Sequence, residues 1–168
     1  MLDCELIDNH SFSDNRGSFK KVFEIDKVKN QTFSLEECFY SVSKKNVIRG
    51  MHWQKRPYEH NKIVFVISGK ILDVVLCIDK DNLNFGKYIA LELSDMENKS
   101  LFIPKGYAHG FLSLEDNTSV VYLTDKKHSA KHDSGIRYDS FSYDWPVRNP
   151  IVSERDLAHP AFKASVSR

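Results

Sequence analysis

The sequence predicts an all-β domain, either an antiparallel sandwich or a barrel. Three observations indicate this fold class. Short runs rich in β-branched and aromatic residues follow one another, turn-forming stretches such as DNRG, SG, DKDN and PKG separate most of them, and long helical patterns are missing. Short strands spaced in this way are typical of sandwiches and barrels.

The expected strands are spread over most of the chain. Aromatic residues make up 12% of the sequence, which suits a β-rich core or a pocket with stacking surfaces. The 168 residues contain no linker, low-complexity tract or internal repeat, so we expect one domain over residues 1–168. In chain order, the expected strands are Ser18–Phe23, Cys38–Val42, Ile63–Ile67, Ile71–Ile78, Tyr88–Leu93, Ser100–Ile103 and Ser119–Thr124.

The clearest predicted hairpin is KIVFVISGKILDVVLCI, with a tight turn near Ser68-Gly69-Lys70. In such a hairpin, Lys62 lies on the same face as Asp73 and Val75. A carboxylate in an apolar strand is costly unless it is paired or hydrogen-bonded, and Lys62 is a candidate diagonal partner. The pair is either a surface ion pair or part of a polar cavity inside the sandwich.

The C-terminal end contains the one helix signal. Ser153-Glu154-Arg155-Asp156 can form a capping box, in which the first side chain accepts a hydrogen bond from the backbone of the first helical turn. Pro160 prevents a long helix. We therefore expect a short helical segment after the strands.

The composition excludes several classes of protein. Lys and Arg number 24 against 23 Asp and Glu, a net charge of +1, whereas nucleic-acid-binding proteins usually carry a basic excess. No segment approaches about 18 apolar residues, and the N-terminus MLDCELIDNH is charged where a signal peptide is apolar. Cys4, Cys38 and Cys77 are scattered without a CxxC pair, which argues against a disulfide framework or a zinc knuckle. We expect a soluble cytoplasmic protein with no nucleic-acid or membrane partner.

Two histidines have unusual settings, His52 in RGMHWQ and His109 in IPKGYAHGF. The second segment resembles the second motif of cupin jelly rolls, many of which bind a metal. The glutamate ligand position of the first cupin motif, counted back from Gly69, holds Lys62, whose ammonium repels a divalent cation. We therefore predict no metal and no cofactor. The alternative left open is an unorthodox site among His52, Glu59, His60 and His109.

A series of motifs covers nearly the whole chain, from about Phe12 to Asp156. In order, they are FSDNRGSF, VIRGMHWQ, KIVFVISGKILDVVL, FGKYIALELS, FIPKGYAHGFLSL, VVYLT, GIRYDS, YDWP and PIVSERD. Each is modest alone, but together they resemble the dTDP-4-dehydrorhamnose 3,5-epimerase family. The resemblance implies a cupin-type jelly roll, a homodimer, no metal and a nucleotide-activated 4-keto-6-deoxysugar as substrate.

The resemblance also implies catalytic roles. A C4 ketone acidifies the hydrogens on C3 and C5, so epimerisation needs a base on one face, an acid on the other and a cation at the enolate oxygen. His52 matches the base, the His of the family's RG-x-H motif, and an imidazole accepts protons near neutral pH. Tyr122 matches the acid on the far face, and Lys62 would stabilise the O4 anion. Asp156 would hold the His52 ring, and Asp73 would orient or neutralise Lys62.

Further residues match the substrate side of the family. Arg16 and Arg49 match arginines there, and a guanidinium suits a pyrophosphate. Phe19 matches a residue near the nucleoside and His109 one near the sugar. Gln54, the last residue of RGMHWQ, joins this substrate-binding set. We expect Gly50 to bulge its strand, because strict alternation would send residues 49 and 52 to opposite faces.

The residues expected around the nucleotide depart from the common form of the family. Lys21 stands where a Glu is frequent, Glu37-Cys38-Phe39 replaces Gln-x-Asn, and His128 replaces a second Tyr. The catalytic set is intact, which favours the same reaction on a different nucleotide sugar. The Glu37 carboxylate could accept from the amino group of cytosine, so CDP and GDP stand beside dTDP, the family default. The alternative is neutral drift at the rim.

Three other classes compete with the epimerase. They are a sugar-nucleotide 3,4-ketoisomerase on the same fold, a non-catalytic sugar-binding cupin and a metal-dependent cupin enzyme. The RG-x-H motif together with S-x-x-D favours an epimerase acting at C3, C5 or both. We expect it in deoxysugar biosynthesis for a surface polysaccharide.

Overall fold

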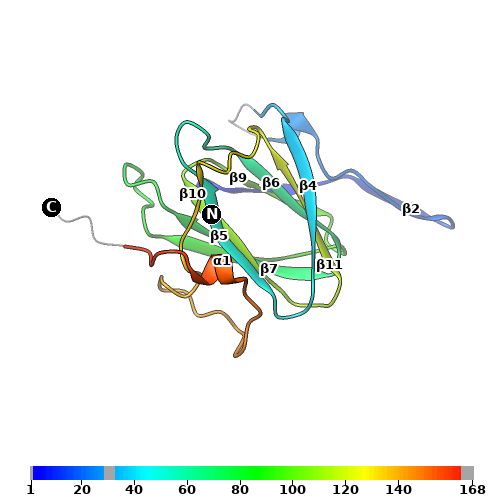
Figure 1. Cartoon of the computed structure of the whole chain (residues 1–168). Coiled ribbons are helices and arrows are strands. Elements are labelled where there is room, and N and C mark those ends of the chain that lie inside the picture. Colours follow the sequence, from blue (N-terminus) through cyan, green and yellow to red (C-terminus); the bar gives the residue numbers. More distant parts are fainter. Residues whose placement is uncertain (1, 29–32, 164–168) are drawn as a thin grey trace.

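A computed structural model describes residues 2–28 and 33–163, which form two antiparallel sheets packed face to face (Figure 1). The first sheet has the order β1 (Glu5–Asp8), β9 (Lys99–Ile103), β6 (Lys62–Ser68), β11 (Thr118–Thr124) and β4 (Glu37–Ser43). The second has the order β12 (Asp133–Gly135), β5 (Ile48–Gln54), β10 (Tyr107–Ser113), β7 (Lys70–Cys77) and β8 (Tyr88–Ser94). The predicted all-β jelly roll is confirmed.

Three smaller elements complete the fold. Strands β2 (Ser11–Asp14) and β3 (Gly17–Lys20) pair with each other and with no other described strand, and they form a ribbon that extends away from the sandwich (Figure 1). A short 3-10 helix spans Ile25–Lys27. Helix α1 (Glu154–Leu157) is the predicted C-terminal helix, and its cap is as expected, since the Ser153 side chain accepts a hydrogen bond from the backbone N–H of Asp156.

The main core lies between the two sheets. Alternate residues of each strand point inward, as the two-residue period of a strand requires. The outer faces are also covered in part, by Val22, Phe23, Val28 and Phe33 over the first sheet and by an aromatic segment around Phe141, Tyr143 and Trp145 over the second. Strands β6 and β7 are therefore buried on both faces, which explains their continuous apolar sequences. The core between the sheets includes Val64, Val66, Ile71, Val75, Leu93, Leu101, Ile103, Phe111 and Val120.

The predicted hairpin between β6 and β7 is wrong. Strand β6 pairs with β9 and β11, whereas β7 pairs with β8 and β10, so the chain passes from one sheet to the other at Gly69. Gly69 has φ +80, and a Cβ there would lie 2.5 Å from the Thr118 hydroxyl. A tight turn at a Gly can connect two strands of one sheet, as in a hairpin, or two strands of different sheets. Because β6 and β7 are buried on both faces, their sequences do not alternate between apolar and polar residues, and nothing in them distinguishes these two connections. Lys62 and Asp73 are therefore not cross-strand neighbours.

The predicted irregularity in β5 is confirmed. His52 pairs with His109 and Arg49 with Phe111, so two residues of β5 stand opposite one residue of β10. Gly50 has φ +132, and a Cβ there would lie 2.4 Å from the α-carbon of Gly110. This bulge turns Arg49 and His52 toward the same side of the sheet.

The other expectations for the chain are largely confirmed. All seven expected strands are present with shifted ends, although the first stops at Lys20. Strands β1, β2, β10 and β12 are not among the expected runs, and β5 was expected only from its RGMHWQ motif. Cys4 and Cys77 are buried, Cys38 is exposed, and all three are free thiols. In the described part of the chain, no helix is long and apolar enough to cross a membrane.

Candidate functional site

A cavity of about 330 Å³ opens between the two sheets. Strands β4, β6 and β11 form one wall, β5 and β10 form the other, and the segment at the start of α1 closes one side. This volume is within the range of small-molecule sites. The predicted residues that line it are Glu37, Arg49, His52, Gln54, Lys62, His109, Tyr122, His128 and Asp156.

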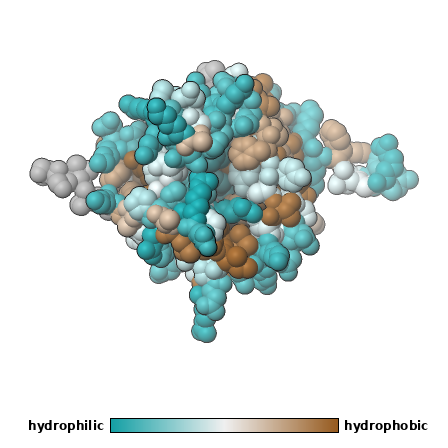
Figure 2. All heavy atoms as spheres, viewed as in Figure 1, coloured by the Kyte–Doolittle hydropathy of each residue, from teal (hydrophilic) through white to brown (hydrophobic). Residues whose placement is uncertain are grey.

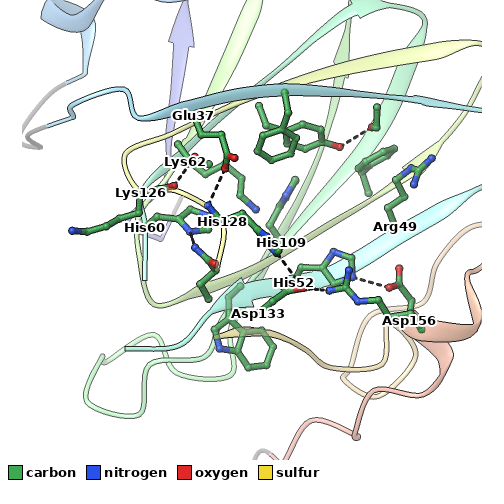
Figure 3. A pocket seen from close by; sticks show the side chains of 18 of the residues that line it. Glu37, Arg49, His52, His60, Lys62, His109, Lys126, His128, Asp133 and Asp156 are labelled. Carbon is green, nitrogen blue, oxygen red and sulfur yellow. Dashed lines mark hydrogen bonds and ion pairs between the residues drawn. The ribbon is translucent and has the colours of Figure 1, made fainter. Parts of the chain in front are cut away.

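His52 and Asp156 form a hydrogen-bonded pair on one wall (Figure 3). The His52 Nε2 lies 2.8 Å from Asp156 Oδ1, and the backbone N–H of Gly50 donates to Asp156 Oδ2 at 3.2 Å. Burial acts to raise the pKa of Asp156, but the hydrogen bond and charge of His52 and the Gly50 N–H outweigh it, so the pKa lies below its usual value. The carboxylate is therefore ionised and stabilises a protonated His52.

Lys62 contributes a cation to the same cavity, and its side chain points toward the space between Glu37 and His109 (Figure 3). Burial lowers the pKa of Lys62 from 10.5 to about 8, while the charges of Asp73 and Asp133 act in the opposite direction. At neutral pH the ammonium is still charged, in surroundings where a charge is poorly solvated.

Asp73 lies behind the cavity wall and binds His109. Its Oδ2 accepts a hydrogen bond from His109 Nε2 at 2.9 Å, and both side chains are almost fully buried. Burial lowers the pKa of His109, although Asp73 opposes the effect, so the ring is neutral at pH 7. The predicted pairing of Asp73 with Lys62 is thus replaced by a second His–Asp pair, and Asp73 reaches Lys62 only through its charge.

Tyr122 stands on the opposite wall, in β11 of the first sheet. Its hydroxyl and the Ser41 hydroxyl share a hydrogen bond of 3.0 Å, and its ring stacks on Phe39 with centroids 4.8 Å apart. Burial raises the pKa of Tyr122, and the Ser41 hydrogen bond only partly opposes this. The phenol is therefore protonated and faces the cavity from the side opposite to His52.

Arg49 reaches from β5 to β4 at the edge of the cavity. Its Nε donates to the Ser43 hydroxyl at 3.0 Å and its Nη2 to the Val42 carbonyl at 3.2 Å. These bonds fix the guanidinium plane and leave further N–H groups for an anionic ligand.

Glu37, Gln54 and His128 form part of the rim. Glu37 Oε2 accepts from the backbone N–H of His128 at 3.0 Å. The Gln54 amide donates to the carbonyls of Tyr58 and Lys127 and accepts from the N–H of Ser129. Gln54 therefore holds the loop of residues 127–129 in place, and its polar atoms are already bonded to protein groups.

Arg16 and Phe19 lie apart from the other predicted residues. They belong to the β2–β3 ribbon, which projects from the body of the molecule (Figures 1 and 2). Phe19 is 62% exposed, and the Arg16 guanidinium bonds the carboxylate of Asp14 within the ribbon at 2.6 Å. The structure does not bring these two residues to the cavity of their own chain.

Several cavity residues, among them Trp53, Asp133 and Arg155, had no predicted role, and His60 was predicted only as a possible metal ligand. Burial lowers the pKa of His60 to about 3, and the neutral ring accepts a hydrogen bond from Gln54. Arg155 and Asp133 form an ion pair at the cavity edge. Trp53 could have been found from the sequence, since it lies in the RGMHWQ motif. No sequence pattern links Asp133 and Arg155, which are brought together by the fold.

The residues that could bind a metal differ from the predicted set, of which they include only His52. Among residues 2–28 and 33–163, one group of three possible ligands is found, and it consists of His52, Asp156 and His159. Their donor atoms all lie within 4.8 Å of one another. Glu59, His60 and His109 are not part of it.

Comparisons with known proteins agree with this geometry. The sequence model of the dTDP-4-dehydrorhamnose 3,5-epimerase family matches residues 1–164. The dTDP-4-dehydrorhamnose 3,5-epimerase of Shigella flexneri is 35% identical over 167 residues, covering 95% of this chain and 91% of that protein. The crystal structure of the Bacillus anthracis epimerase, with TDP and PPi bound, has a TM-score of 0.91 and 34% identity, covering 95% of this chain and 94% of that one. A Legionella pneumophila structure in complex with dTDP-4-keto-L-rhamnose has a TM-score of 0.89 and 27% identity, covering 94% and 87%.

Proposed function

Because this chain belongs to the dTDP-4-dehydrorhamnose 3,5-epimerase family, we propose that it inverts C3, C5 or both in a nucleotide-diphosphate 4-keto-6-deoxyhexose. One observation carries the proposal: the His52–Asp156 pair faces Tyr122 across a cavity that also contains Lys62. A base, an acid on the opposite wall and a cation are the groups that proton exchange next to a ketone requires.

His52 takes the first proton. The C–H next to the C4 ketone gives its proton to the imidazole, and its electron pair forms an enolate. The Asp156 carboxylate holds the ring and stabilises the imidazolium, because its depressed pKa keeps it ionised. A general base of this kind typically contributes about 10²–10⁴-fold to the rate.

Lys62 stabilises the negative charge on O4 of the enolate. A buried ammonium acts more strongly on such an oxyanion than a solvated one does, because little water screens it. Asp73 and Asp133 keep enough negative charge nearby for Lys62 to remain protonated at neutral pH.

Tyr122 returns a proton to the opposite face of the sugar. Its raised pKa keeps the phenol protonated before the reaction, and its hydrogen bond with Ser41 fixes the direction of the hydroxyl. The carbon is then inverted, with the old proton on His52 and the new one from Tyr122. Exchange of both groups with solvent restores the starting state.

Arg49 binds the pyrophosphate, and the rim around Glu37 and His128 binds the nucleoside. We take dTDP as the nucleotide, since relatives carry TDP or a dTDP-sugar in their structures. CDP is the second candidate, because one Glu37 oxygen bonds the His128 N–H, and the other, which has no partner among residues 2–28 and 33–163, can accept from the cytosine amino group. Calorimetry with dTDP, CDP and GDP decides, and dTDP binding far more tightly than CDP rules out the CDP assignment.

The working unit is a homodimer. Arg16 and Phe19 can serve as substrate-binding residues only in the cavity of a second copy, because their ribbon leads away from their own. The outer face of the first sheet also exposes Tyr40, Val42 and Ile67, and Figure 2 shows hydrophobic atoms on the same side as the ribbon. We place the enzyme in the cytoplasm, in deoxysugar biosynthesis for a surface polysaccharide.

NMR of a dTDP-linked 4-keto-6-deoxyhexose in D₂O tests the reaction. The wild-type enzyme should introduce deuterium at C3, C5 or both with inversion, and His52→Ala should abolish it. If neither carbon exchanges, the epimerase assignment fails. Migration of the keto group from C4 to C3 would instead identify a ketoisomerase.

A further inference from the structure

A histidine with no role in the proposed reaction lies beside the base. The rings of His159 and His52 meet edge to face, with centroids 5.7 Å apart at 71°. The His159 Nε2 lies 4.0 Å from Asp156 Oδ1, the same oxygen that bonds His52 Nε2 at 2.8 Å. One carboxylate oxygen therefore stands between two imidazole nitrogens, all within 4.8 Å of one another.

The backbone of β12 makes room for the His159 ring. A Cβ on Gly135 would lie 2.4 Å from both Cδ2 and Nε2 of His159, so any side chain at this position would displace the ring. Gly135 is also the direct cross-strand partner of His52 in β5. The absence of a side chain at one residue of β12 thus brings the second imidazole next to the first.

The His159 Nε2 atom is buried, and no hydrogen-bond partner is found for it within residues 2–28 and 33–163. A buried polar atom without a partner is uncommon in proteins, and each case calls for an explanation, such as a bound ion or water. The Asp156 carboxylate, which is also buried, lies 4.0 Å from it.

We propose that His52, Asp156 and His159 bind a divalent transition-metal ion, with Zn²⁺ as the expected ion, and that this ion inhibits the enzyme. Two imidazoles and one carboxylate are ligands that zinc accepts, whereas Mg²⁺ and Ca²⁺ prefer oxygen ligands. Zinc bonds of about 2.0–2.1 Å place tetrahedral ligand atoms roughly 3.3 Å apart. The observed separations from Asp156 Oδ1, 2.8 and 4.0 Å, lie on either side of that value.

An ion held by these three residues would lie at the wall of the substrate cavity, because His52 and Asp156 both line it. An ion on His52 Nε2 takes the place of the proton that His52 shares with Asp156. It adds a positive charge beside the ring that must become an imidazolium. The inhibition, unlike the binding itself, rests on the proposed role of His52 as the base.

Titration of the metal-free protein with ZnCl₂ by calorimetry tests the site, and CoCl₂ with visible absorption reports tetrahedral ligation independently of activity. We expect one ion per chain. His159→Gln should raise the Kd for Zn²⁺ by about 100-fold or more, the upper end of the effect of losing even an outer partner of a metal ligand. Its epimerase activity in the absence of metal should stay within about twofold of the wild type. Gly135→Ala, which moves the ring and keeps the imidazole, should also weaken binding.

His132→Gln and Cys38→Ser are the matched controls, since they remove another partly buried imidazole and the exposed thiol. Both should bind Zn²⁺ as the wild type does. Equal Zn²⁺ affinity in the wild type and His159→Gln, or no binding at all, overturns the site. Binding that depends on His159 but leaves activity untouched overturns the inhibition and the role of His52, while the metal site stands.

Discussion

Lys62→Met is expected to make the protein more stable and nearly inactive. The pKa of Lys62 falls from 10.5 to about 8 in the folded protein, so folding disfavours the charged form. At about 1.4 kcal/mol per pKa unit, the burial of this charge costs up to about 3 kcal/mol at pH 7. Methionine has a similar length and no charge, and we expect a gain of about 1–3 kcal/mol in the free energy of unfolding.

The gain should depend on pH in a defined way. Below pH 8 Lys62 is charged in both the folded and the unfolded chain, so the whole cost is present. Between pH 8 and 10.5 the unfolded chain holds the extra proton, and the stability of the wild type therefore rises with pH. Above 10.5 both states are neutral, and the difference between the wild type and Lys62→Met should vanish.

The activity should change in the opposite direction. Removing one group that stabilises an oxyanion typically lowers kcat by about 10²–10³-fold. In the wild type, kcat should fall above pH 8, because about nine in ten molecules carry the Lys62 charge at pH 7 and only about one in ten at pH 9.

Urea unfolding at pH 7 and at pH 10.5 gives the stabilities, and deuterium incorporation gives the rates. Lys126→Met is the matched control, since it makes the same substitution at an exposed position of the same cavity. We expect it to change stability by less than about 0.5 kcal/mol. If Lys62→Met unfolds at a lower urea concentration than the wild type, the ammonium is stabilised by its surroundings and the reasoning from burial is wrong.

Three further predictions concern other parts of the site. Tyr122→Phe should lower inversion by about 10²-fold or more, because the acid is lost, while proton abstraction by His52 continues. NMR should then show exchange without inversion, and normal inversion would contradict the assignment. Asp73→Asn should lower the pKa of Lys62 below about 8, because the Asp73 charge raises it. The alkaline fall of the pH–rate profile should move to lower pH, and an unchanged profile would refute the coupling. Gly50→Ala should destabilise the protein by more than about 3 kcal/mol in thermal unfolding, because its Cβ meets the backbone of β10 at 2.4 Å. Gly86→Ala, at a φ of +77 in the left-handed region and with nothing closer to its Cβ than 3.9 Å, should cost only about 1 kcal/mol; equal losses would show that neither the close contact nor the φ of +132 at Gly50 matters.

Local patterns explain what the sequence predicted well. The N-cap at Ser153 depends on residues three positions apart, and the Ser153 hydroxyl accepts from the Asp156 N–H as expected. The Asp156 carboxylate bonds His52 and Gly50, so the second bond of the capping box is replaced by bonds in the site. The strand runs depend on neighbouring residues, and all are found. The family resemblance is confirmed over nearly the whole chain, and it supports the epimerase over the ketoisomerase. The expected contact between His52 and Asp156, 104 residues apart, came from that resemblance and not from any local signal.

The remaining features depend on contacts that no local pattern contains. The sequence showed that Asp73 needs a partner, but the partner, His109, is 36 residues away and is fixed by the pairing of β7 with β10. The sheet exchange at Gly69 depends on which strands flank β6 and β7, and this is a property of the whole sandwich. The separation of Arg16 from the cavity follows from the ribbon of β2 and β3, which joins neither five-stranded sheet in the part of the chain that the structure describes.

The hydrogen bond between the Glu37 carboxylate and the backbone of residue 128 affects which substitutions an enzyme of this kind can accept during evolution. Glu37 accepts the backbone N–H at position 128, so any residue except proline can stand there without losing the bond. Exchange of the side chain at 128 gives up its ion pair with Asp133 at 3.6 Å but keeps the backbone bond to Glu37. Under the proposed function, single substitutions at position 128 should therefore change the preference for the nucleotide while the catalytic residues stay in place.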